Sequence, residues 1–416
     1  MSRKFGTDGV RGRANLEVGP ELAMALGNAM VGVVGPRIAV ARDTRPSGPM
    51  LEAAVVAGIC AAGGTAIRCG VLPTPGLSAL VAGHGWDGGV MVTASHNPAH
   101  DNGLKALGPG GHKVEGGVRA AIEGQLQLPI RLADEPGGVE ERRDAGADYV
   151  RRVLAVVPRK RWLAGRTLVL DTANGAATRL AAQVLGALGA RVIAVGDGDG
   201  AINHGCGALH PEVMAERVRE AGADGGISLD GDGDRVAVCD PDGRVLDGDA
   251  ILWLCRAGEV VVGTVMTNGG LEAALAGEGR RLVRAPVGDA HVAAAMKAHG
   301  ARLGGEPSGH LLFADALPTA DGLVAGLRAL FPDPRTLGER LAGYVPFAQS
   351  TRAVRTPGDR VARTTAEQER LRAAGARVVV RASGTEPVVR VMVEHAEAAF
   401  AESAADSLTR ALTTDH

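Results

Sequence analysis

Three aspartates at alternate positions, Asp230, Asp232 and Asp234, are the residues of this chain best suited to bind a metal ion. They follow the apolar run 226–229, which is typical of a buried strand. The glycines between them let the backbone curl, so that the three carboxylates can converge. Convergent carboxylate oxygens form a hard site that suits Mg²⁺ better than a soft metal, and a protein-bound Mg²⁺ commonly meets a substrate phosphate.

Two other structures are alternatives for this acidic loop, and the sequence excludes the first of them. A calcium EF-hand that began at Asp230 would need Gly at its sixth position and Glu at its twelfth, where the chain has Arg235 and Pro241. A solvated acidic turn is the plain alternative, and we expect it of residues 197–200 and 247–249. The buried strand before the first loop distinguishes it from these two.

Ser95 is the candidate nucleophile, with its neighbour His96 as a second candidate for the chemistry. The surrounding sequence lacks the G-x-S-x-G elbow of a hydrolase triad. A serine that carries a phosphoryl group and faces Mg²⁺ explains both loops, because the metal neutralises charge on the phosphate oxygens during an in-line transfer. An ordinary Asx or ST turn remains possible for this loop taken alone.

A second phosphate cradle is predicted near the C-terminus. Arg381 supplies a permanently charged fork, Ser383 and Thr385 supply hydroxyls, and Gly384 lets backbone N–H groups approach an anion. An ordinary hairpin turn is the alternative. Two phosphate sites suggest a sugar that carries phosphate at both ends and turns around between two transfers, which is the reaction of a mutase.

The loop 304–310 supplies the predicted sugar contacts. The Glu306 carboxylate and the Ser308 hydroxyl suit sugar hydroxyl groups. His310 and Arg235 complete the predicted substrate-binding set, although a capped turn with a structural histidine would have the same sequence. The loop therefore predicts a sugar site beside the metal site.

Two early cations are candidates for the transfer step itself. Lys105 lies shortly after Ser95 in the sequence and is the first candidate for proton transfer, with a purely electrostatic role as the alternative. Arg11 is expected to face phosphate. Placement on the surface is the plain alternative for both side chains.

The elements that must position these loops follow one repeated layout of strand, polar Gly turn, helix and strand, typical of a right-handed βαβ unit. Each unit is followed by another strand and then by one of the loops that contain Ser95, Asp230 or Glu306. Open α/β sheets bind ligands at the carboxyl ends of their strands, so three such domains can direct three loops into one cleft. The units run over residues 38–67, 168–193 and 261–283.

The predicted fold class is α/β, with three similar mixed α/β domains plus a C-terminal α+β domain, arranged around a central active-site cleft. The last domain is expected to contain strands 377–380 and 388–393 and a helix near 396–412, with a surface helix within 355–370. The predicted domains carry, in order, the phosphoserine, metal-binding, sugar-binding and phosphate-binding loops, and they span residues 1–150, 151–247, 248–345 and 346–416.

The bulk composition excludes several partner classes. The 416 residues are 45% hydrophobic and 22% charged, as in a globular protein, with a net charge of −2. This charge, with only 2% aromatic residues, argues against nucleic acid and anionic lipid as partners. With no apolar run of about 18 residues and no hydrophobic signal segment, we expect a cytoplasmic protein, monomer or homodimer, that does not enter a membrane. The five cysteines contain no C-x-x-C pair and are expected to be free thiols.

Six motifs occur in one order along the chain, and together they resemble the α-D-phosphohexomutase family, most closely its glucosamine-specific members. The opening motif and the loop 304–310 favour those members over phosphomannomutases and phosphoglucomutases, which remain the alternative. The motifs are FGTDGVRG (5–12), TASHNP (93–98), DNGLK (101–105), DGDGDR (230–235), GGEPSGH (304–310) and RASGTEP (381–387).

The resemblance implies an isomerase that interconverts glucosamine 6-phosphate and glucosamine 1-phosphate and feeds UDP-N-acetylglucosamine and cell-wall (peptidoglycan precursor) synthesis. It implies that Ser95 is a phosphoserine, and that Mg²⁺ is held by the three aspartates together with this phosphoserine. The intermediate would be glucosamine 1,6-bisphosphate, with this compound or glucose 1,6-bisphosphate as primer.

Two positions depart from the family pattern. Residues 287–291 read VGDAH where these enzymes commonly read V-G-D-R-Y, and residues 319–322 read TADG in place of T-G-D-G. Two other functions are kept as hypotheses. One is a haloacid-dehalogenase-type phosphatase with Asp230 as nucleophile and Asp232 as acid/base, and the other is a sugar-phosphate-binding protein without turnover.

Overall fold

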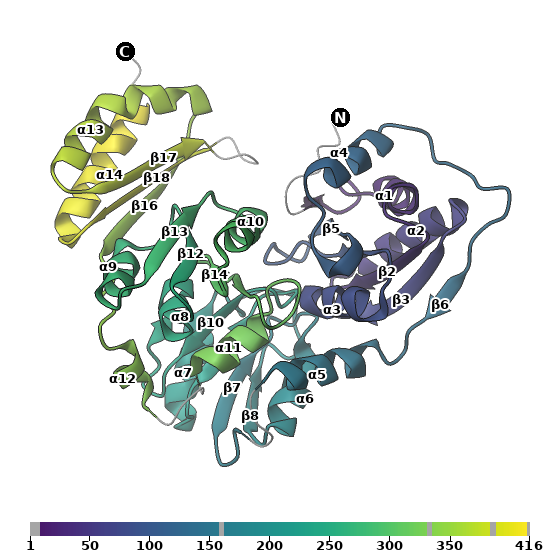
Figure 1. The fold of residues 1–416 in the computed structure, drawn as a ribbon, viewed down its shortest axis with the longest axis horizontal. Helices are drawn as coiled ribbons and strands as arrows, with labels where there is room; N and C mark the ends of the chain where they lie inside the picture. Colours follow the sequence, from purple (N-terminus) through teal and green to yellow (C-terminus); the bar gives the residue numbers. More distant parts are fainter. Residues whose placement is uncertain (1–8, 158–161, 331–334, 383–387, 414–416) are drawn as a thin grey trace.

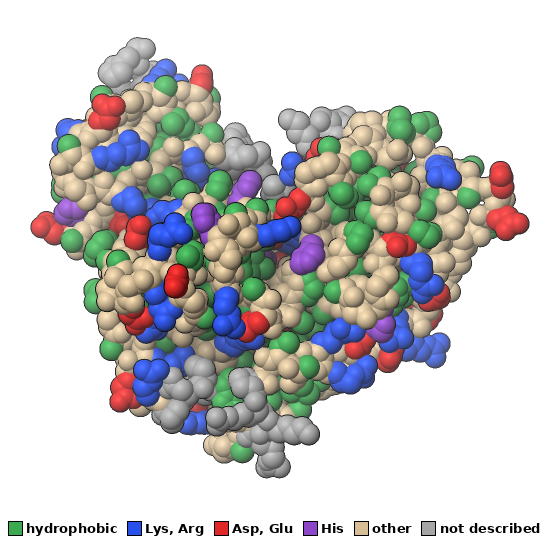
Figure 2. Space-filling model, viewed as in Figure 1, with side chains coloured by type: hydrophobic (Ala, Val, Ile, Leu, Met, Phe, Trp, Pro, Cys, Tyr) green, Lys and Arg blue, Asp and Glu red, His purple; other side chains and the backbone are tan. Residues whose placement is uncertain are grey.

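A computed structural model describes residues 9–157, 162–330, 335–382 and 388–413. The chain forms four units that lie along an arc, each with its own sheet (Figure 1). The first and fourth units face each other across the open side of the arc, and the outline of the molecule is indented there in Figure 2. Among the described residues, no helix has the length and apolar character needed to cross a membrane.

The first unit contains a six-stranded sheet in the order β1-β5-β4-β2-β3-β6. Its strands are β1 (Val10–Arg13), β2 (Arg37–Arg42), β3 (Thr65–Val71), β4 (Gly88–Val92), β5 (Asp101–Leu107) and β6 (Val139–Glu141). Its helices are α1 (Pro20–Val33), α2 (Gly48–Ala61), α3 (Thr74–His84), α4 (Gly116–Gln125) and α5 (Ala145–Val156), with a 3₁₀ turn, η1 (Pro109–Gly111).

The second unit contains a five-stranded sheet in the order β11-β10-β9-β7-β8. Its strands are β7 (Thr167–Asp171), β8 (Arg191–Val195), β9 (Gly226–Leu229), β10 (Val236–Cys239) and β11 (Val245–Leu246), and its helices are α6 (Thr178–Ala187) and α7 (Pro211–Ala221).

The third unit contains a four-stranded sheet in the order β13-β12-β14-β15. Its strands are β12 (Val260–Thr264), β13 (Arg281–Ala285), β14 (Leu303–Gly305) and β15 (Leu311–Phe313). Its helices are α8 (Gly248–Leu254), α9 (Gly269–Gly277), α10 (Asp289–His299), α11 (Gly322–Leu330) and α12 (Leu337–Leu341).

One arrangement recurs in these three sheets. In each, the first strand of the βαβ unit lies between two parallel neighbours, in the orders β3-β2-β4, β8-β7-β9 and β13-β12-β14. The last of these strands then turns back through an antiparallel hairpin into β5, β10 or β15. The predicted α/β class and the three similar units are confirmed. The loops that contain Ser95, Asp230 and Glu306 occupy equivalent positions at the three hairpins.

The fourth unit is an antiparallel sheet in the order β16-β18-β17, covered by helices. The strand β16 was not expected from the sequence, whereas both predicted strands and the terminal helix are present. The elements are β16 (Ala348–Arg355), η2 (Gly358–Thr364), α13 (Thr365–Ala373), β17 (Arg377–Ala382), β18 (Val388–His395) and α14 (Ala398–Thr413).

The hydrophobic clusters do not coincide with the four sheets. One continuous hydrophobic cluster includes Leu77 of the first unit, Leu168 of the second and Leu303 of the third. The fourth unit has a cluster of its own, around Val391 and Leu408. Burial therefore binds the first three units into one body. The fourth unit is attached to that body by polar contacts, among them the backbone N–H of Gly269 donating to the buried Glu394 at 3.0 Å.

One predicted domain boundary lies inside a helix, and the other two lie between elements. Residue 150 lies inside α5, a helix that packs against both α3 and α6. Residues 247 and 345 lie between elements. The four domain ranges remain predictions.

The acidic turn at 247–249 is not a solvated turn, so that prediction is wrong. Asp247 caps α8 by accepting from the backbone N–H of Ala250 at 2.9 Å, and the buried Asp249 accepts from that of Asn268 at 2.8 Å. Burial and then the Asp247 charge raise the pKa of Asp249 to about 7. Residues 197–200 are exposed, as predicted, and the five cysteines are free.

Candidate active site

The three aspartates of the loop between β9 and β10 converge as predicted. Asp230, Asp232 and Asp234 are buried, and one carboxylate oxygen of each lies within 4.8 Å of the others. Within the described part of the chain, Oδ1 of Asp232 and Oδ1 of Asp234 are buried without a hydrogen-bond donor. Buried polar atoms are normally paired, so these oxygens fit a hard divalent cation.

Lys105 offsets part of this negative charge. Its Nζ lies 2.7 Å from Oδ2 of Asp232 and 3.0 Å from Oδ2 of Asp234. Burial alone would raise the pKa of Asp234, but Lys105 and then His310 hold it well below its ordinary value. Burial and the two neighbouring carboxylates raise the pKa of Asp230 to about 7, because a further negative charge is unfavourable beside them.

Ser95 lies directly against the acidic loop. Its hydroxyl donates to Oδ2 of Asp230 at 2.6 Å, and Nδ1 of His96 lies 3.3 Å from the same hydroxyl. The backbone of Ser95 has a φ of +53°, a left-handed conformation that is uncommon for residues other than glycine and that concentrates at functional sites. The predicted nucleophile and the predicted metal loop are therefore in contact.

Two residues that the sequence did not point to, the buried Arg45 and the partly buried Asn203, hold the Ser95 loop in place. Arg45 donates from Nη2 to the carbonyl oxygens of Ser95 at 2.8 Å and Asn97 at 2.7 Å. The amide of Asn203, from the second unit, donates to the same two oxygens at 2.8 and 2.9 Å. Neither residue belongs to a recognisable motif, because each acts on backbone atoms that any residue would supply.

The cationic side chains predicted for this region gather beside the same loop. Burial, followed by the charges of Arg235 and Arg11, lowers the pKa of His96 to about 4, so the ring is neutral at neutral pH. Burial also lowers the pKa of Arg11, against the opposing effect of the nearby Asp232 carboxylate. Arg11 thus faces the metal loop and not the surface.

The predicted sugar loop abuts the metal loop. Arg235 forms an isolated antiparallel bridge with His310, whose Nδ1 lies 3.7 Å from Oδ1 of Asp234. Glu306 accepts from the backbone N–H of Gly288 at 2.9 Å, and Ser308 is exposed. The loop thus places a buried carboxylate and an exposed hydroxyl next to the acidic site.

Arg381 belongs to a pair of arginines in the fourth unit. It lies directly opposite Arg390 across β17 and β18, and burial followed by the Arg390 charge lowers the pKa of Arg381. Like charges at opposite positions of a sheet are unfavourable, so an anion bound between the two side chains would relieve their repulsion. Ser383, Gly384 and Thr385, the other residues predicted for this cradle, lie outside the described residues.

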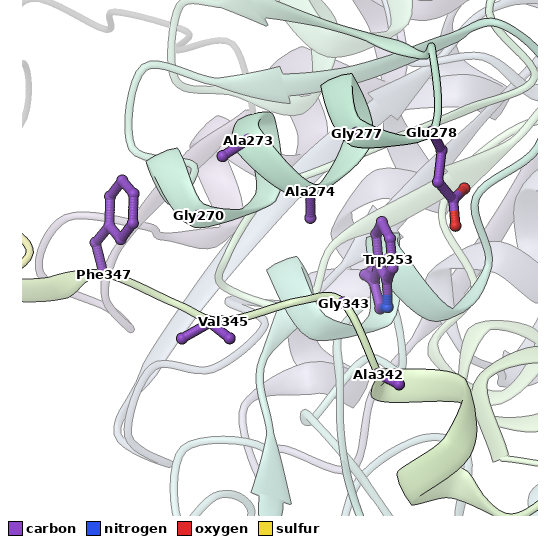
Figure 3. Close-up of a pocket in the computed structure, with 10 residues that line it drawn as sticks. All are labelled: Trp253, Gly270, Ala273, Ala274, Gly277, Glu278, Ala342, Gly343, Val345 and Phe347. Atoms are coloured by element: carbon purple, nitrogen blue, oxygen red, sulfur yellow. The ribbon is translucent and has the colours of Figure 1, made fainter.

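A groove of about 460 Å³ between α9 and the segment 342–347 is separate from these loops (Figure 3). Small residues of α9 form one wall, and Trp253 and Phe347 contribute aromatic surface. None of the predicted site residues lines it.

The chain is similar to one known protein family along most of its length. Models of the phosphoglucomutase/phosphomannomutase family match domain I at residues 2–128, domain II at 147–243, domain III at 247–333 and the C-terminal domain at 340–411. The chain belongs to this family. A phosphoglucosamine mutase from Afipia carboxidovorans is 41% identical to it over 99% of both chains.

Solved phosphohexomutase structures share the fold. A phosphoglucomutase/phosphomannomutase family protein from Burkholderia thailandensis has a TM-score of 0.80 at 25% identity and covers 99% of this chain and 97% of its own. An Aspergillus fumigatus N-acetylphosphoglucosamine mutase solved with glucose 1,6-bisphosphate has a TM-score of 0.68 at 20% identity, with 99% and 95% covered.

Family membership explains the chemistry of the site. Phosphohexomutases are Mg²⁺-dependent isomerases that act on phosphosugars, and the buried triad fits that requirement. Two residues near the sugar loop, Lys113 and Asp289, were given no role from the sequence, although Asp289 occupies the aspartate position of the V-G-D-R-Y pattern. They form a nearly buried ion pair between the first and third units, which sequence reasoning missed.

Proposed function

We propose that this phosphohexomutase interconverts glucosamine 6-phosphate and glucosamine 1-phosphate. The observation that carries the proposal is the contact between the Ser95 hydroxyl and Asp230, and the Arg381–Arg390 pair on adjacent strands of the fourth unit supports it. The relatives named phosphoglucosamine mutase supply the choice of sugar. The product feeds UDP-N-acetylglucosamine and cell-wall synthesis.

In the first half-reaction, a phosphoryl group leaves Oγ of phosphorylated Ser95 and bonds to a sugar hydroxyl oxygen. That hydroxyl loses its proton to a nearby base, for which Lys105 and the neutral His96 are the candidates. The Ser95 oxygen that the phosphoryl group leaves takes up a proton. The resulting bisphosphate turns around, and its other phosphoryl group leaves its sugar oxygen and bonds to the Ser95 oxygen, while the Ser95 proton passes to the freed sugar oxygen. The balance is one phosphoryl group given and one taken back, so the enzyme ends phosphorylated.

Asp230, Asp232 and Asp234 would hold Mg²⁺ together with the phosphoserine. When bound, the ion supplies neutralising charge to the phosphate oxygens. The chain's own contribution here is a buried set of converging carboxylates, with the Lys105 side chain within 3.0 Å of two of them.

The substrate is held from the opposite end. Arg381 and Arg390 bind its distal phosphate, with Ser383, Gly384 and Thr385 as predicted partners. Glu306 and Ser308 contact sugar hydroxyls, while Arg11, Arg235 and His310 line the phosphate side. A cytoplasmic location, a monomer or homodimer, and domains at 1–150, 151–247, 248–345 and 346–416 remain predictions.

A coupled assay tests the proposal. Purified protein is primed with glucose 1,6-bisphosphate in the presence of Mg²⁺ and offered glucosamine, glucose or mannose 6-phosphate in turn. We expect the glucosamine substrate to have the highest kcat/KM. A higher kcat/KM for glucose 6-phosphate or mannose 6-phosphate would change the proposed sugar, but the proposed mutase reaction would stand.

Two further outcomes distinguish the other hypotheses. Phosphate trapped on Asp230 and not on Ser95, with free phosphate as product, would indicate a phosphatase of the haloacid-dehalogenase type. Tight binding of glucosamine 6-phosphate without any exchange of label between the two positions would indicate a binding protein.

A further inference from the structure

A chain of polar side chains, formed by lysines, aspartates and one histidine, connects three units around the proposed site. Lys113, in the segment after η1, pairs with Oδ2 of Asp289, the first residue of α10. Oδ2 of Asp289 also lies 3.6 Å from Nε2 of His310, whose Nδ1 is 3.7 Å from Asp234. Asp234 in turn pairs with Lys105 of β5. The series therefore begins and ends in the first unit.

The two lysines belong to one short stretch of the chain. Lys105 is on β5, and Lys113 is tied back to the end of that strand by an isolated bridge with Leu107. One hairpin of the phosphoserine unit thus contacts the metal loop with one lysine and the sugar-binding unit with the other. Movement of the third unit relative to the first would break the Lys113–Asp289 pair.

Asp289 is also coupled to the sugar loop through its neighbour. The backbone N–H of Gly288 donates to Oε1 of Glu306 at 2.9 Å. Fixing the side chain of Asp289 therefore fixes the peptide that orients Glu306. The ring of His310, on the same loop, lies between Asp289 and Asp234.

We propose that Lys113 and Asp289 are positioning residues that hold the sugar-binding loop at its working distance from the phosphoserine and metal loops. The inference rests on the proposed function for the role of Glu306, but not on which sugar is bound. Displacing a reacting group by about 1 Å can cost about 100-fold in rate, so such a device has a measurable consequence. Neither residue touches the reacting atoms.

A purely stabilising ion pair is the competing explanation, and the two differ in what a double replacement does. Removing one member of a buried pair leaves an unpaired charge and is strongly destabilising, whereas replacing both is often nearly neutral for stability. The double variant Lys113→Met/Asp289→Asn therefore separates positioning from stability. Lys113→Arg, which keeps the charge, is the conservative variant.

The experiment measures kcat and KM for phosphosugar, calorimetric binding of glucosamine 6-phosphate, Tm, and phosphoserine content by intact mass. For the double variant we expect a Tm close to that of the wild type, an unchanged capacity of Ser95 to be phosphorylated, and a KM raised at least about tenfold with weaker binding to match. For Lys113→Arg we expect a KM and a binding constant between those of the wild type and those of the double variant. Lys297→Met, which removes an exposed lysine from α10, is the matched control and should leave KM unchanged.

A KM and binding constant within twofold of the wild type in the double variant would overturn the inference, whatever the Tm. If wild-type protein failed to turn over any of the three hexose 6-phosphates, the proposed function would fall instead. The positioning inference would then be judged by calorimetric binding of the hexose phosphate that the wild type binds best.

Discussion

The hydroxyl oxygen of Ser95 lies 2.6 Å from a carboxylate oxygen of Asp230, although 135 residues separate the two along the chain. Each sits at the hairpin that follows the parallel core of its own sheet. The first unit also contacts the metal loop through the backbone N–H of Thr74, at the start of α3, which donates to the carbonyl oxygen of Asp232 at 2.9 Å. Docking of the first two units therefore assembles the nucleophile and the metal loop together.

Replacing Ser95 with Ala should abolish turnover. The phosphoryl acceptor is removed, so we expect kcat to fall by more than about 10³-fold and the intact mass to show no added phosphate. Ser407→Ala, in α14 of the fourth unit, is the control and should keep both. Substantial activity in the first variant would rule out a covalent role for Ser95.

Asp232→Asn should weaken Mg²⁺ binding by at least about tenfold, because one of the converging carboxylates loses its charge. The Mg²⁺ dependence of activity and calorimetric titration with MgCl₂ measure this. Asp199→Asn changes an exposed aspartate in a similar D-G sequence and should have no effect. An unchanged Mg²⁺ affinity in the first variant would count against the ligand assignment.

Lys105→Met should make stability depend on Mg²⁺. Without the ammonium group, the buried carboxylates of Asp232 and Asp234 lose a close counter-charge, which typically costs about 3–5 kcal/mol. We expect Tm in EDTA to drop sharply, and MgCl₂ to raise the Tm of the variant by more than it raises that of the wild type. Equal increments in both proteins would show that Lys105 and the metal do not share these carboxylates.

Arg381→Ala should mainly impair substrate binding. Loss of a charged hydrogen-bond donor to phosphate is worth about 1.5–3 kcal/mol, so we expect KM to rise about 10- to 100-fold with a smaller change in kcat. Arg370→Ala, on the exposed face of α13, is the control. An unchanged KM would place the distal phosphate elsewhere.

Asp321 should contribute to the pH dependence of stability. It is buried, accepts from the hydroxyl of Tyr149 at 2.8 Å and from the backbone N–H of Val324 at 2.9 Å, and burial raises its pKa to about 6. A carboxyl whose pKa is higher in the folded state favours folding when protonated. Its contribution is therefore full below about pH 4 and is lost as the pH rises through 6.

Urea unfolding of the wild type and of Asp321→Asn at pH 4 to 7 measures this effect. The amide keeps the shape of the side chain and does not titrate. We expect the free energy of unfolding of the wild type, relative to the variant, to fall with rising pH by no more than about 3 kcal/mol. A constant difference across the range would contradict the shifted pKa.

The sequence was sufficient to predict those parts of the site that consist of consecutive residues. The acidic loop and the Ser95 loop were found because short runs of residue types define them, and the βαβ layout followed from strand and turn patterns. Arg45 and Asn203 were missed because they bind backbone carbonyl groups of residues that are distant from them in the sequence. The pairing of Lys113 with Asp289 likewise depends on how whole units dock, which no local pattern encodes.

The same limit explains the error at 247–249. Its D-G-D sequence resembles the exposed turn at 197–200, and local composition predicts the same solvation for both. In the structure, the helix α8 begins at Gly248 and is buried along its whole length, so Asp249 is carried inside. Burial there is decided by the packing of the neighbouring elements and not by the residues of the turn.

The left-handed backbone at Ser95 means that the residue best for stability at this position differs from the residue needed for activity. Such a conformation costs a residue with a β-carbon about 1–3 kcal/mol, and glycine adopts it freely. Directed evolution under heat alone, with no demand for product, should therefore enrich glycine at position 95. The persistence of serine under metabolic selection would then reflect the hydroxyl that the reaction consumes and restores in every cycle.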